Sequence, residues 1–304
     1  MTTPELYELY LKASGVSTDT RQVKKGDLFF ALRGENFNAN EFASEALKAG
    51  AIAAVIDDDR FSQEGTMLVH DSLEALQDLA RHHRKQLPYP IIGLTGSNGK
   101  TTSKELLVAA LSEKYKTGYT KGNLNNHIGV PLTVLNLPAD AEIAVIEMGA
   151  NHQKEIEFLS EISRPNHGFI TNFGKAHLEG FGGIEGIIKG KSELYENLRE
   201  NNNTAWYNIE DPLQEEKSKG IKRFSFGASE RANYPVFPVL KPNSPFLSVQ
   251  FKQVTITSKL TGAYNFGNIA CAVALASYFG LKPEEIKTGI EKYVPSNNRS
   301  QMGE

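Results

Sequence analysis

The stretch Gly93-Leu-Thr-Gly-Ser-Asn-Gly-Lys-Thr-Thr102 decides the fold of most of this 304-residue chain. The apolar run 91–95 predicts a buried strand just before it, and 100–111 predicts a helix just after it. A glycine-rich turn in this position directs backbone N–H groups and the positive end of the helix dipole at a phosphate. We therefore predict a nucleotide-binding P-loop, although the glycines at 93, 96 and 99 do not meet the G-x-x-x-x-G-K-[ST] spacing.

Two side chains of this loop have expected chemical tasks. Lys100 would neutralise the β and γ phosphates of ATP, and the hydroxyl of Thr101 would coordinate Mg²⁺. The competing interpretation is a glycine turn followed by a surface lysine, which the flanking strand and helix disfavour. The further predicted nucleotide contacts are Gly96, Ser97, Asn98, Gly99 and Thr102.

An alternation of apolar strands and helices continues after the loop. This rhythm is typical of a parallel sheet that is covered by helices on both faces. A proline-containing region of short strands follows, which predicts an antiparallel extension, and two helices end the domain. The expected strands are 143–147 and 168–171, the helices are 154–159, 184–198, 266–278 and 283–292, and the extension is 221–260.

The N-terminal part predicts a smaller α/β domain. Its last helix is predicted from Ser72, the expected N-cap, to about Gln86, and Pro88-Tyr-Pro90 then interrupts it. We therefore expect domains over 1–87 and 88–294, and a linker to an absent third domain over 295–304. The other expected helices of the first domain are 4–13 and 40–49, and its expected strands are 27–32, 51–56 and 67–69.

Composition excludes several classes of protein. The 33 basic and 36 acidic side chains give a net charge of −3, and 40% of the residues are hydrophobic, which argues against a disordered or nucleic-acid-coating chain. The one cysteine, Cys271, permits no internal disulfide. The longest apolar stretch, 270–276, is too short to cross a bilayer. A cytoplasmic protein, without nucleic-acid or membrane partners and monomeric, is expected.

Further polar residues are expected near the P-loop. Glu147 ends the apolar strand 143–147, and Asn172 and His177 follow the next strand, so all three are expected at the carboxyl edge of the sheet. Beside a P-loop, Glu147 is expected to bind Mg²⁺ or position water, whereas alone it would read as a solvated strand end. The segment 121–131 predicts a binding loop, with a structural turn as the alternative. Its candidate substrate contacts are Asn123, Asn125 and Asn126.

Four segments in this order resemble the Mur ligase family, the ATP-dependent amide ligases that build the peptide stem of bacterial peptidoglycan. The segments are TGSNGKTTSKE (95–105), TKGNLNNHIGVPLTVL (120–135), EMGANHQKEI (147–156) and ITNFGKAHLEGFG (170–182). The resemblance covers nearly the whole chain. It implies a role in cell-wall biogenesis, and through it in cell shape and division.

The resemblance also implies binding roles in the first domain. The segments 17–21, 25–34 and 46–50 are similar to the uridine-nucleotide-binding domain found in this family. This domain would hold the UDP end of the substrate. The implied contacts are Ser17, Thr18, Asp19, Thr20 and Arg21.

In the second domain the resemblance implies a metal site at the reacting phosphate. Glu147 and His177 would be metal ligands, and Lys191 would be a carbamylated lysine that also binds metal, because 191–195 matches the family context better than the context of Lys189 does. Asn268 would contact adenine, with Tyr264 in place of the usual histidine. Arg299 would contact the nucleotide.

The wording of the segments is most similar to ligases that join D-Ala-D-Ala to UDP-N-acetylmuramoyl (UDP-MurNAc) tripeptide through an acyl phosphate. Three alternatives stay open: a family member that adds the third residue of the stem, a nucleotide-binding module without turnover, and a P-loop motor or regulatory ATPase. The family has a third domain of a hundred-odd residues, so we expect this chain to be a truncated form that is inactive alone.

Overall fold

A computed structural model describes residues 2–242 and 244–295, and these residues form two compact units. The first unit holds 1–88 together with 124–137, and the second holds 89–123 and the residues from 138 onward. The chain thus leaves the second unit after Asn123 and returns to it at Pro138. Sequence periodicity does not predict this excursion, because it depends on contacts between segments distant in the chain.

The first unit is built on a parallel sheet in the order β1-β2-β5-β6. One face of this sheet packs Phe29, Ala54 and Ile56 against Ala43 and Ala46 of helix α2. The bounds are α1 (Thr3–Tyr10), β1 (Val16–Ser17), β2 (Leu28–Phe30), the hairpin β3 (Arg33–Gly34) and β4 (Phe37–Asn38), α2 (Ala43–Lys48), β5 (Ala53–Ile56), β6 (Thr66–Leu68) and α3 (Ser72–Arg84).

Helix α5 (Gly129–Leu135) belongs to the first unit and packs on α3. The hydroxyl of Tyr10 donates to the carbonyl of Leu135 at 2.7 Å. Asn136 accepts from the backbone N–H of Val16 and donates to its carbonyl, both at 2.9 Å, so its side chain pairs with the edge strand β1 as another strand would. At Gly129 a Cβ would lie 2.3 Å from the carbonyl carbon of Leu124, which requires glycine at the start of this helix.

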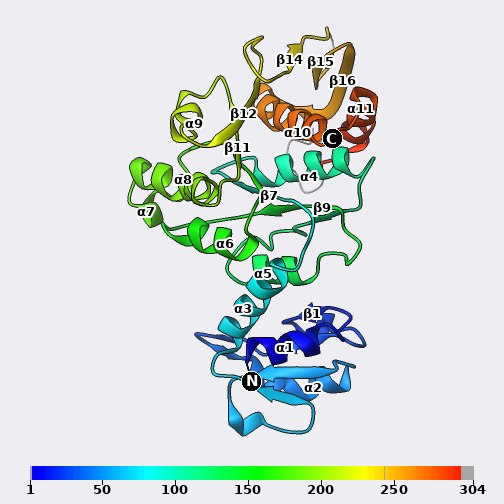
Figure 1. The fold of residues 1–304 in the computed structure, drawn as a ribbon, viewed down its shortest axis with the longest axis vertical. Coiled ribbons are helices and arrows are strands. Elements are labelled where there is room, and N and C mark those ends of the chain that lie inside the picture. Colours follow the sequence, from blue (N-terminus) through cyan, green and yellow to red (C-terminus); the bar gives the residue numbers. More distant parts are fainter. Residues whose placement is uncertain (1, 243, 296–304) are drawn as a thin grey trace. The chain divides into compact units, whose positions relative to one another are not determined.

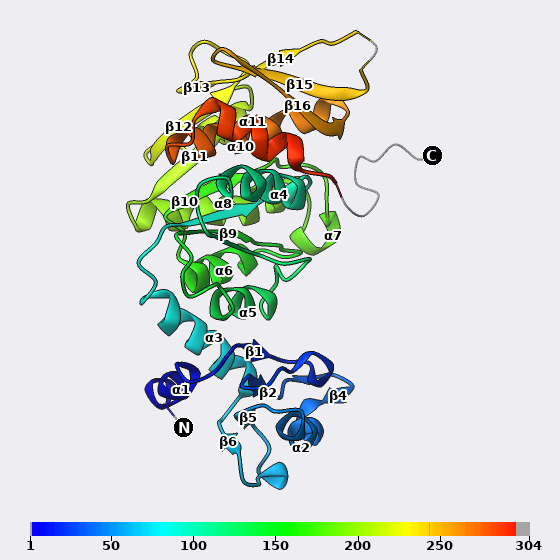
Figure 2. The same cartoon turned by 90° about the vertical axis from the view of Figure 1, so that its right-hand side faces the viewer.

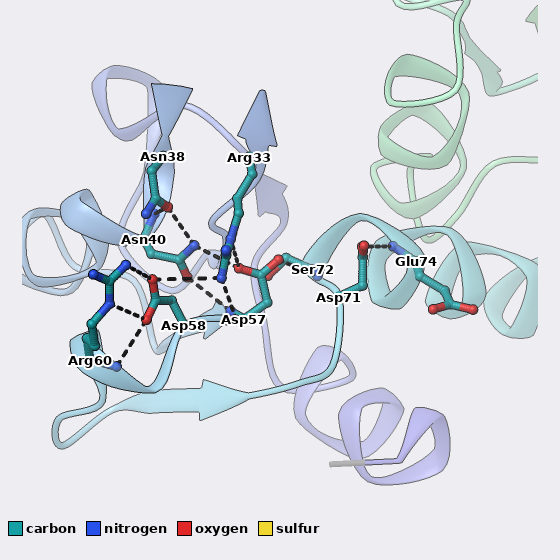
Figure 3. A network of polar contacts seen from close by, with 9 residues as sticks. All are labelled: Arg33, Asn38, Asn40, Asp57, Asp58, Arg60, Asp71, Ser72 and Glu74. Carbon is teal, nitrogen blue, oxygen red and sulfur yellow. Dashed lines mark hydrogen bonds and ion pairs between the residues drawn. The ribbon is translucent and has the colours of Figure 1, made fainter. Parts of the chain in front are cut away.

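The end of β5 is a polar junction (Figure 3). The Oδ1 of Asp57 accepts from Nε of Arg33 at 2.6 Å and from Nδ2 of Asn40 at 2.8 Å, and its Oδ2 accepts from the N–H of Ser72 at 3.1 Å. Burial opposes ionisation, but these hydrogen bonds leave the pKa of Asp57 below its ordinary value. One carboxylate therefore fastens β3, the segment after β4 and the start of α3.

The predicted N-cap at Ser72 is wrong by one residue. Asp71 is the N-cap of α3, and its carboxylate accepts from the N–H of Glu74 at 2.8 Å. Aspartate and serine are both good N-caps, so local preference does not separate them. Ser72 is the first residue of the helix, and its N–H donates to Asp57.

The second unit holds a seven-stranded sheet in the order β13-β12-β11-β10-β7-β9-β8, with every pairing parallel. The expected α/β fold is confirmed. The strands are β7 (Ile91–Thr95), β8 (Thr117–Tyr119), β9 (Ile143–Glu147), β10 (His167–Ile170), β11 (Thr204–Asn208), β12 (Lys222–Gly227) and β13 (Tyr234–Pro235).

Helices cover both faces of this sheet (Figures 1 and 2). Helices α4, α10 and α11 lie on one face, and α6 and α8 lie on the other. Alternate residues of β7 serve the two faces: Ile92 and Leu94 join the core with α4 and α10, whereas Gly93 faces Met148 and Pro165. The helices are α4 (Lys100–Leu111), α6 (Glu155–Ser163), α7 (Leu178–Phe181), α8 (Ile184–Glu200), α9 (Pro212–Lys217), α10 (Phe266–Tyr278) and α11 (Pro283–Lys292).

The predicted antiparallel extension over 221–260 is only partly right. Strands β12 and β13 continue the main sheet in parallel, and only β14 (Phe237–Val239), β15 (Phe246–Phe251) and β16 (Val254–Thr261) form an antiparallel sheet. Phe226 of β12 is fully buried in the core of the main sheet, as expected for a strand of a parallel sheet covered by helices. Within the described residues, no helix has the length and apolar character needed to span a membrane.

Candidate active site

The phosphate loop connects the central strand β7 to α4, and two glycines give it its shape. Gly96 has φ +145° and Gly99 has φ +78°, both disfavoured for other residues. A Cβ on Gly96 would lie 1.9 Å from Oγ1 of Thr171, and one on Gly99 would lie 2.7 Å from Oδ1 of Asn268. The loop is therefore tightly enclosed by the ends of β10 and α10.

Residues after β10 hold the loop through hydrogen bonds. Asn172 accepts from the N–H of Ser97 with its carbonyl at 3.1 Å and from the N–H of Asn98 with its side chain at 3.2 Å. Thr171 donates its hydroxyl proton to the carbonyl of Asn98 at 2.6 Å. The hydroxyl of Ser97, which is buried, donates to the carbonyl of Gly174 at 2.6 Å. Asn172 therefore holds the shape of the loop. The sequence predicts its place at the edge of the sheet but not this role.

Lys100 is the first residue of α4, and its ammonium group lies across the loop. Its Nζ donates to the carbonyl of Gly96 at 2.8 Å and to that of Ser97 at 3.3 Å. A cation held there adds to the positive end of the α4 dipole. An anion bound at the loop would therefore meet backbone N–H groups at the start of α4 and also the positive charge of Lys100.

The structure brings Glu147 and Thr101 together. Glu147 is 1% exposed at the end of β9, and its Oε1 accepts from the hydroxyl of Thr101 at 3.3 Å. Its backbone N–H donates to Oγ1 of Thr120 at 2.9 Å. A carboxylate and a hydroxyl at this separation supply two of the hard oxygen ligands that Mg²⁺ prefers.

Sequence reasoning did not single out Lys104, a second lysine of α4. Its side chain is fully buried, its Nζ donates to the carbonyl of Thr120 at 2.8 Å, and it lies 3.7 Å from Oε2 of Glu147. The one available signal was the spacing, because residues three and four positions apart share a helix face, which places Lys104 beside Thr101 and Lys100.

Lys191 lies on α8 in surroundings that lower the pKa of its amine. Its Nζ donates to the carbonyl of Ala150 at 3.1 Å and sits 4.9 Å from the ring centre of Phe181. Burial, and then the positive charge of Lys100, lower the pKa of Lys191 to about 8. A lysine with this pKa has far more neutral, nucleophilic amine at neutral pH than an exposed one.

The other predicted metal ligand, His177, is exposed at the turn before α7, with φ +57°. The part of the chain that the structure describes contains no group of three or more His, Cys, Asp or Glu side chains able to hold a metal. Glu147 and His177 therefore do not form a preassembled cluster of that kind.

Asn268, on α10, lies against Gly99 of the phosphate loop. Its Oδ1 accepts from the hydroxyl of Ser103 at 2.9 Å, and its Nδ2 donates to Asn265 at 2.9 Å. Tyr264 is 74% exposed nearby in the chain. Arg299 lies outside the described residues.

In the first unit, residues 18–21 line a pocket of about 560 Å³. The rings of Phe37 and Phe42 stack in its wall, with centroids 5.6 Å apart. Arg21 forms two side-chain hydrogen bonds to Asp19, at 2.7 and 2.9 Å, and these lower the pKa of Asp19 to about 2. Ser17 serves the same turn, since its hydroxyl donates to the carbonyl of Asp19 at 3.0 Å.

The three asparagines of the predicted binding loop are separated by the unit division. Asn123 belongs to the second unit, and Asn125 and Asn126 belong to the first. Asn126 has a structural task, because its Oδ1 accepts from the N–H groups of Ile128 and Gly129, at 3.1 and 2.8 Å, where α5 begins.

Comparison with known proteins gives two family matches. The Mur ligase middle domain matches residues 94–276, and the domain described as "Mur ligase family, catalytic domain" matches residues 12–84. The UDP-N-acetylmuramoyl-tripeptide--D-alanyl-D-alanine ligase of Bacillus subtilis is 37% identical over 95% of the chain, and that of Escherichia coli is 37% identical over 96%. The chain spans 64% and 66% of these two proteins.

Solved structures agree. MurF from Acinetobacter baumannii superposes with a TM-score of 0.83 at 32% identity, covering 97% of this chain and 68% of that one. MurF ligase from Thermotoga maritima, solved in complex with ADP, gives 0.79 at 30% identity, covering 94% and 67%. A UDP-N-acetylmuramoyl-L-alanyl-D-glutamate--2,6-diaminopimelate ligase gives 0.59 at 18% identity, which shows a shared fold alone. A ligase that adds the third stem residue is therefore not the favoured interpretation.

Proposed function

The chain belongs to the Mur ligase family, and from this premise we propose that it forms the UDP-substrate-binding and ATP-binding part of a ligase that joins D-Ala-D-Ala to UDP-MurNAc-tripeptide. The γ-phosphoryl group of ATP would pass to the terminal carboxylate of the tripeptide. The amine of D-Ala-D-Ala would then attack the acyl phosphate, giving an amide, ADP and phosphate. ATP and a UDP-linked substrate also favour a cytoplasmic location.

The observation that carries this proposal is the arrangement of Lys100 over the phosphate loop, beside the pair Thr101 and Glu147. A carboxylate is a poor electrophile at neutral pH, so the reaction needs an activated leaving group. Lys100 would release the carbonyls of Gly96 and Ser97 and move to the phosphate oxygens, where it stabilises the charge on the transferred group. No side-chain nucleophile is required.

The residues present fit a magnesium ion that arrives with the nucleotide. Thr101 and Glu147 would hold it, with phosphate oxygens and water in the other positions. Bound there, Mg²⁺ would neutralise charge on the β and γ phosphates. We also propose His177 and a carbamylated Lys191 as metal ligands at the reacting phosphate. The lowered pKa of Lys191 supports its carbamylation, because only the neutral amine reacts with CO₂.

The pocket of the first unit fits the UDP end of the substrate. Phe37 and Phe42 offer aromatic faces for a base, and Arg21, with 84% of its side chain exposed, offers a charge for phosphate. We propose Thr18, Asp19 and Thr20 as further contacts, with Ser17 holding their turn. Asn123, Asn125 and Asn126 are proposed contacts of the muramoyl peptide, and Asn268 and Arg299 are proposed contacts of ATP.

The test is calorimetric binding of the ATP analogue AMP-PNP with Mg²⁺ to the chain and to its Lys100→Ala variant. We expect binding to the chain and a loss of about 100-fold or more in the variant, because the charge on the phosphates is then unopposed. Absence of binding, or equal binding by both proteins, would contradict the proposal. Robust ATP hydrolysis without any UDP substrate would favour a regulatory ATPase.

A further inference from the structure

Lys104 carries a positive charge into the interior of the second unit, where its side chain is 2% exposed. Burying an ammonium group is costly unless it gains charged and hydrogen-bonding partners. The residue lies one turn after Thr101 on α4, so the two side chains emerge on the same face of the helix. That face lies against the end of β9.

The partners of Lys104 form a closed arrangement with Glu147. The Nζ of Lys104 donates to the carbonyl of Thr120 at 2.8 Å and to that of Gly122 at 3.5 Å. The hydroxyl oxygen of Thr120 accepts from the backbone N–H of Glu147 at 2.9 Å. Lys104 and the backbone of Glu147 are thus fixed by the same threonine.

The carboxylate of Glu147 divides its two oxygens between different neighbours. Oε1 faces the hydroxyl of Thr101 at 3.3 Å, and Oε2 faces the ammonium of Lys104 at 3.7 Å. Oε1 is therefore on the side of the phosphate loop. Oε2 is on the side of a buried cation.

We propose that Lys104 acts as a counter-cation of Glu147 and thereby limits how tightly the site holds a nucleotide-bound divalent cation. The inference rests on the proposed function, since it takes Thr101 and Glu147 as the metal-holding pair. The ammonium of Lys104 and a divalent cation held by Glu147 would both be positive and would repel each other strongly in this poorly solvated site. Without Lys104, the carboxylate of Glu147 would lose the cation beside its Oε2, so it would attract a divalent cation and repel metal-free phosphate more strongly.

The experiment compares the chain with its Lys104→Met variant, which keeps the length of the side chain and removes the charge. The dissociation constant of AMP-PNP is measured in EDTA and in saturating Mn²⁺. The ratio of the constant in EDTA to the constant in Mn²⁺ gives the contribution of the metal to binding. We expect this ratio to rise about tenfold or more in Lys104→Met. Loss of the positive charge should strengthen binding of the metal-bound nucleotide and weaken binding of the metal-free nucleotide. A lysine with a merely structural role would leave the ratio unchanged or lower it.

Two control variants isolate the charge at this position. Lys104→Arg keeps the cation, and Lys114→Met removes a lysine from the same unit whose Nζ donates to the carbonyl of Gly280 at 2.9 Å, in an exposed contact. Both should keep the ratio within about threefold of the unchanged chain. If Lys104→Met does not fold, Lys104→Gln replaces it, since the amide can still donate to Thr120.

Thermal unfolding gives a readout independent of nucleotide affinity. In EDTA the Tm of Lys104→Met should lie below that of the unchanged chain, and Mn²⁺ with AMP-PNP should raise it by more than it raises the Tm of the unchanged chain. An equal or smaller ratio in folded Lys104→Met overturns the inference alone. An unchanged chain that binds no AMP-PNP overturns the proposed function as well.

Discussion

The hydroxyl of Thr101 donates to Oε1 of Glu147 at 3.3 Å, which joins the first turn of α4 to the end of β9. The parallel pairing of β7 with β9 makes this contact possible, because Glu147 is in register with Leu94, next to the phosphate loop. The two residues are distant in sequence, yet the edge of the sheet brings them together beside the phosphate loop.

Replacing Thr101 with valine should remove the metal-dependent part of nucleotide binding. The shape of the side chain is kept and one oxygen ligand is lost, so the affinity for AMP-PNP should fall about tenfold in Mg²⁺ and stay the same in EDTA. Calorimetry in the two buffers measures this. Thr117→Val, on β8, is the control, and an equal loss of affinity in EDTA would refute a metal-binding role for Thr101.

Gly96→Ala should destabilise the second unit and weaken nucleotide binding. The new Cβ would lie 1.9 Å from Oγ1 of Thr171, whose hydroxyl holds the carbonyl of Asn98. We expect the free energy of unfolding to fall by about 2–3 kcal/mol in urea titrations. Gly182→Ala is matched, because Gly182 also has positive φ but no neighbour within 4 Å of the added carbon, and should cost about 1 kcal/mol. Equal costs would show that the enclosure of the loop is unimportant.

Lys191 should carry a carbamate. Its neutral amine would attack the carbon of CO₂, forming an N–C bond while one C=O electron pair moves to oxygen, and the nitrogen would then release a proton to solvent. With ¹³C-bicarbonate, NMR should show a carbamate resonance in the unchanged chain and in Lys189→Met, whose lysine is exposed, but none in Lys191→Met. A resonance that survives in Lys191→Met would assign the modification elsewhere.

Stability should fall as the pH drops from 6.5 toward 4, in part because of His167. This histidine is buried and accepts a hydrogen bond from Nε1 of Trp206 at 3.2 Å. Burial, and then the charge of Lys222, lower its pKa to about 4, so the unfolded chain binds a proton in this pH range and the folded chain does not. The stability it contributes is complete above pH 6.5.

Urea unfolding at pH 7.5 and 4.5 compares the chain with His167→Asn. The loss of unfolding free energy between the two pH values should be about 2 kcal/mol smaller in the variant. Burial also lowers the pKa of His83 to about 4, and this contribution is common to both proteins. Identical pH dependence would show that His167 stays neutral in the unfolded chain or is solvated in the folded one.

Sequence patterns locate elements best where local signals are strong. The predicted spans 91–95, 100–111, 143–147, 266–278 and 283–292 coincide with β7, α4, β9, α10 and α11. Each has a continuous apolar run or a helical period with clear boundaries. By contrast, β8 and β11 were not predicted, and the return of 124–137 to the first unit depends on partners such as Asn136 and Val16, which are 120 residues apart.

In the candidate site, too, the sequence predicts residues that have a local signal and misses those whose properties depend on distant contacts. Lys100, Thr101 and Glu147 follow from the glycine turn and the ends of strands, and the structure places them together. Lys104 reads as an ordinary helix residue in sequence, because its importance comes from burial beside Glu147. The depressed pKa of Lys191 likewise depends on the burial that Ala150 and Phe181 provide.

The most direct test of the account is calorimetric binding of UDP-MurNAc-tripeptide to this chain, beside the corresponding dipeptide nucleotide. We predict that the tripeptide nucleotide binds, that it binds more tightly than the dipeptide nucleotide, and that Arg21→Ala weakens both through loss of a phosphate contact. Tighter binding of the dipeptide nucleotide, or no binding of either ligand, would contradict the proposed substrate and the role of the first unit.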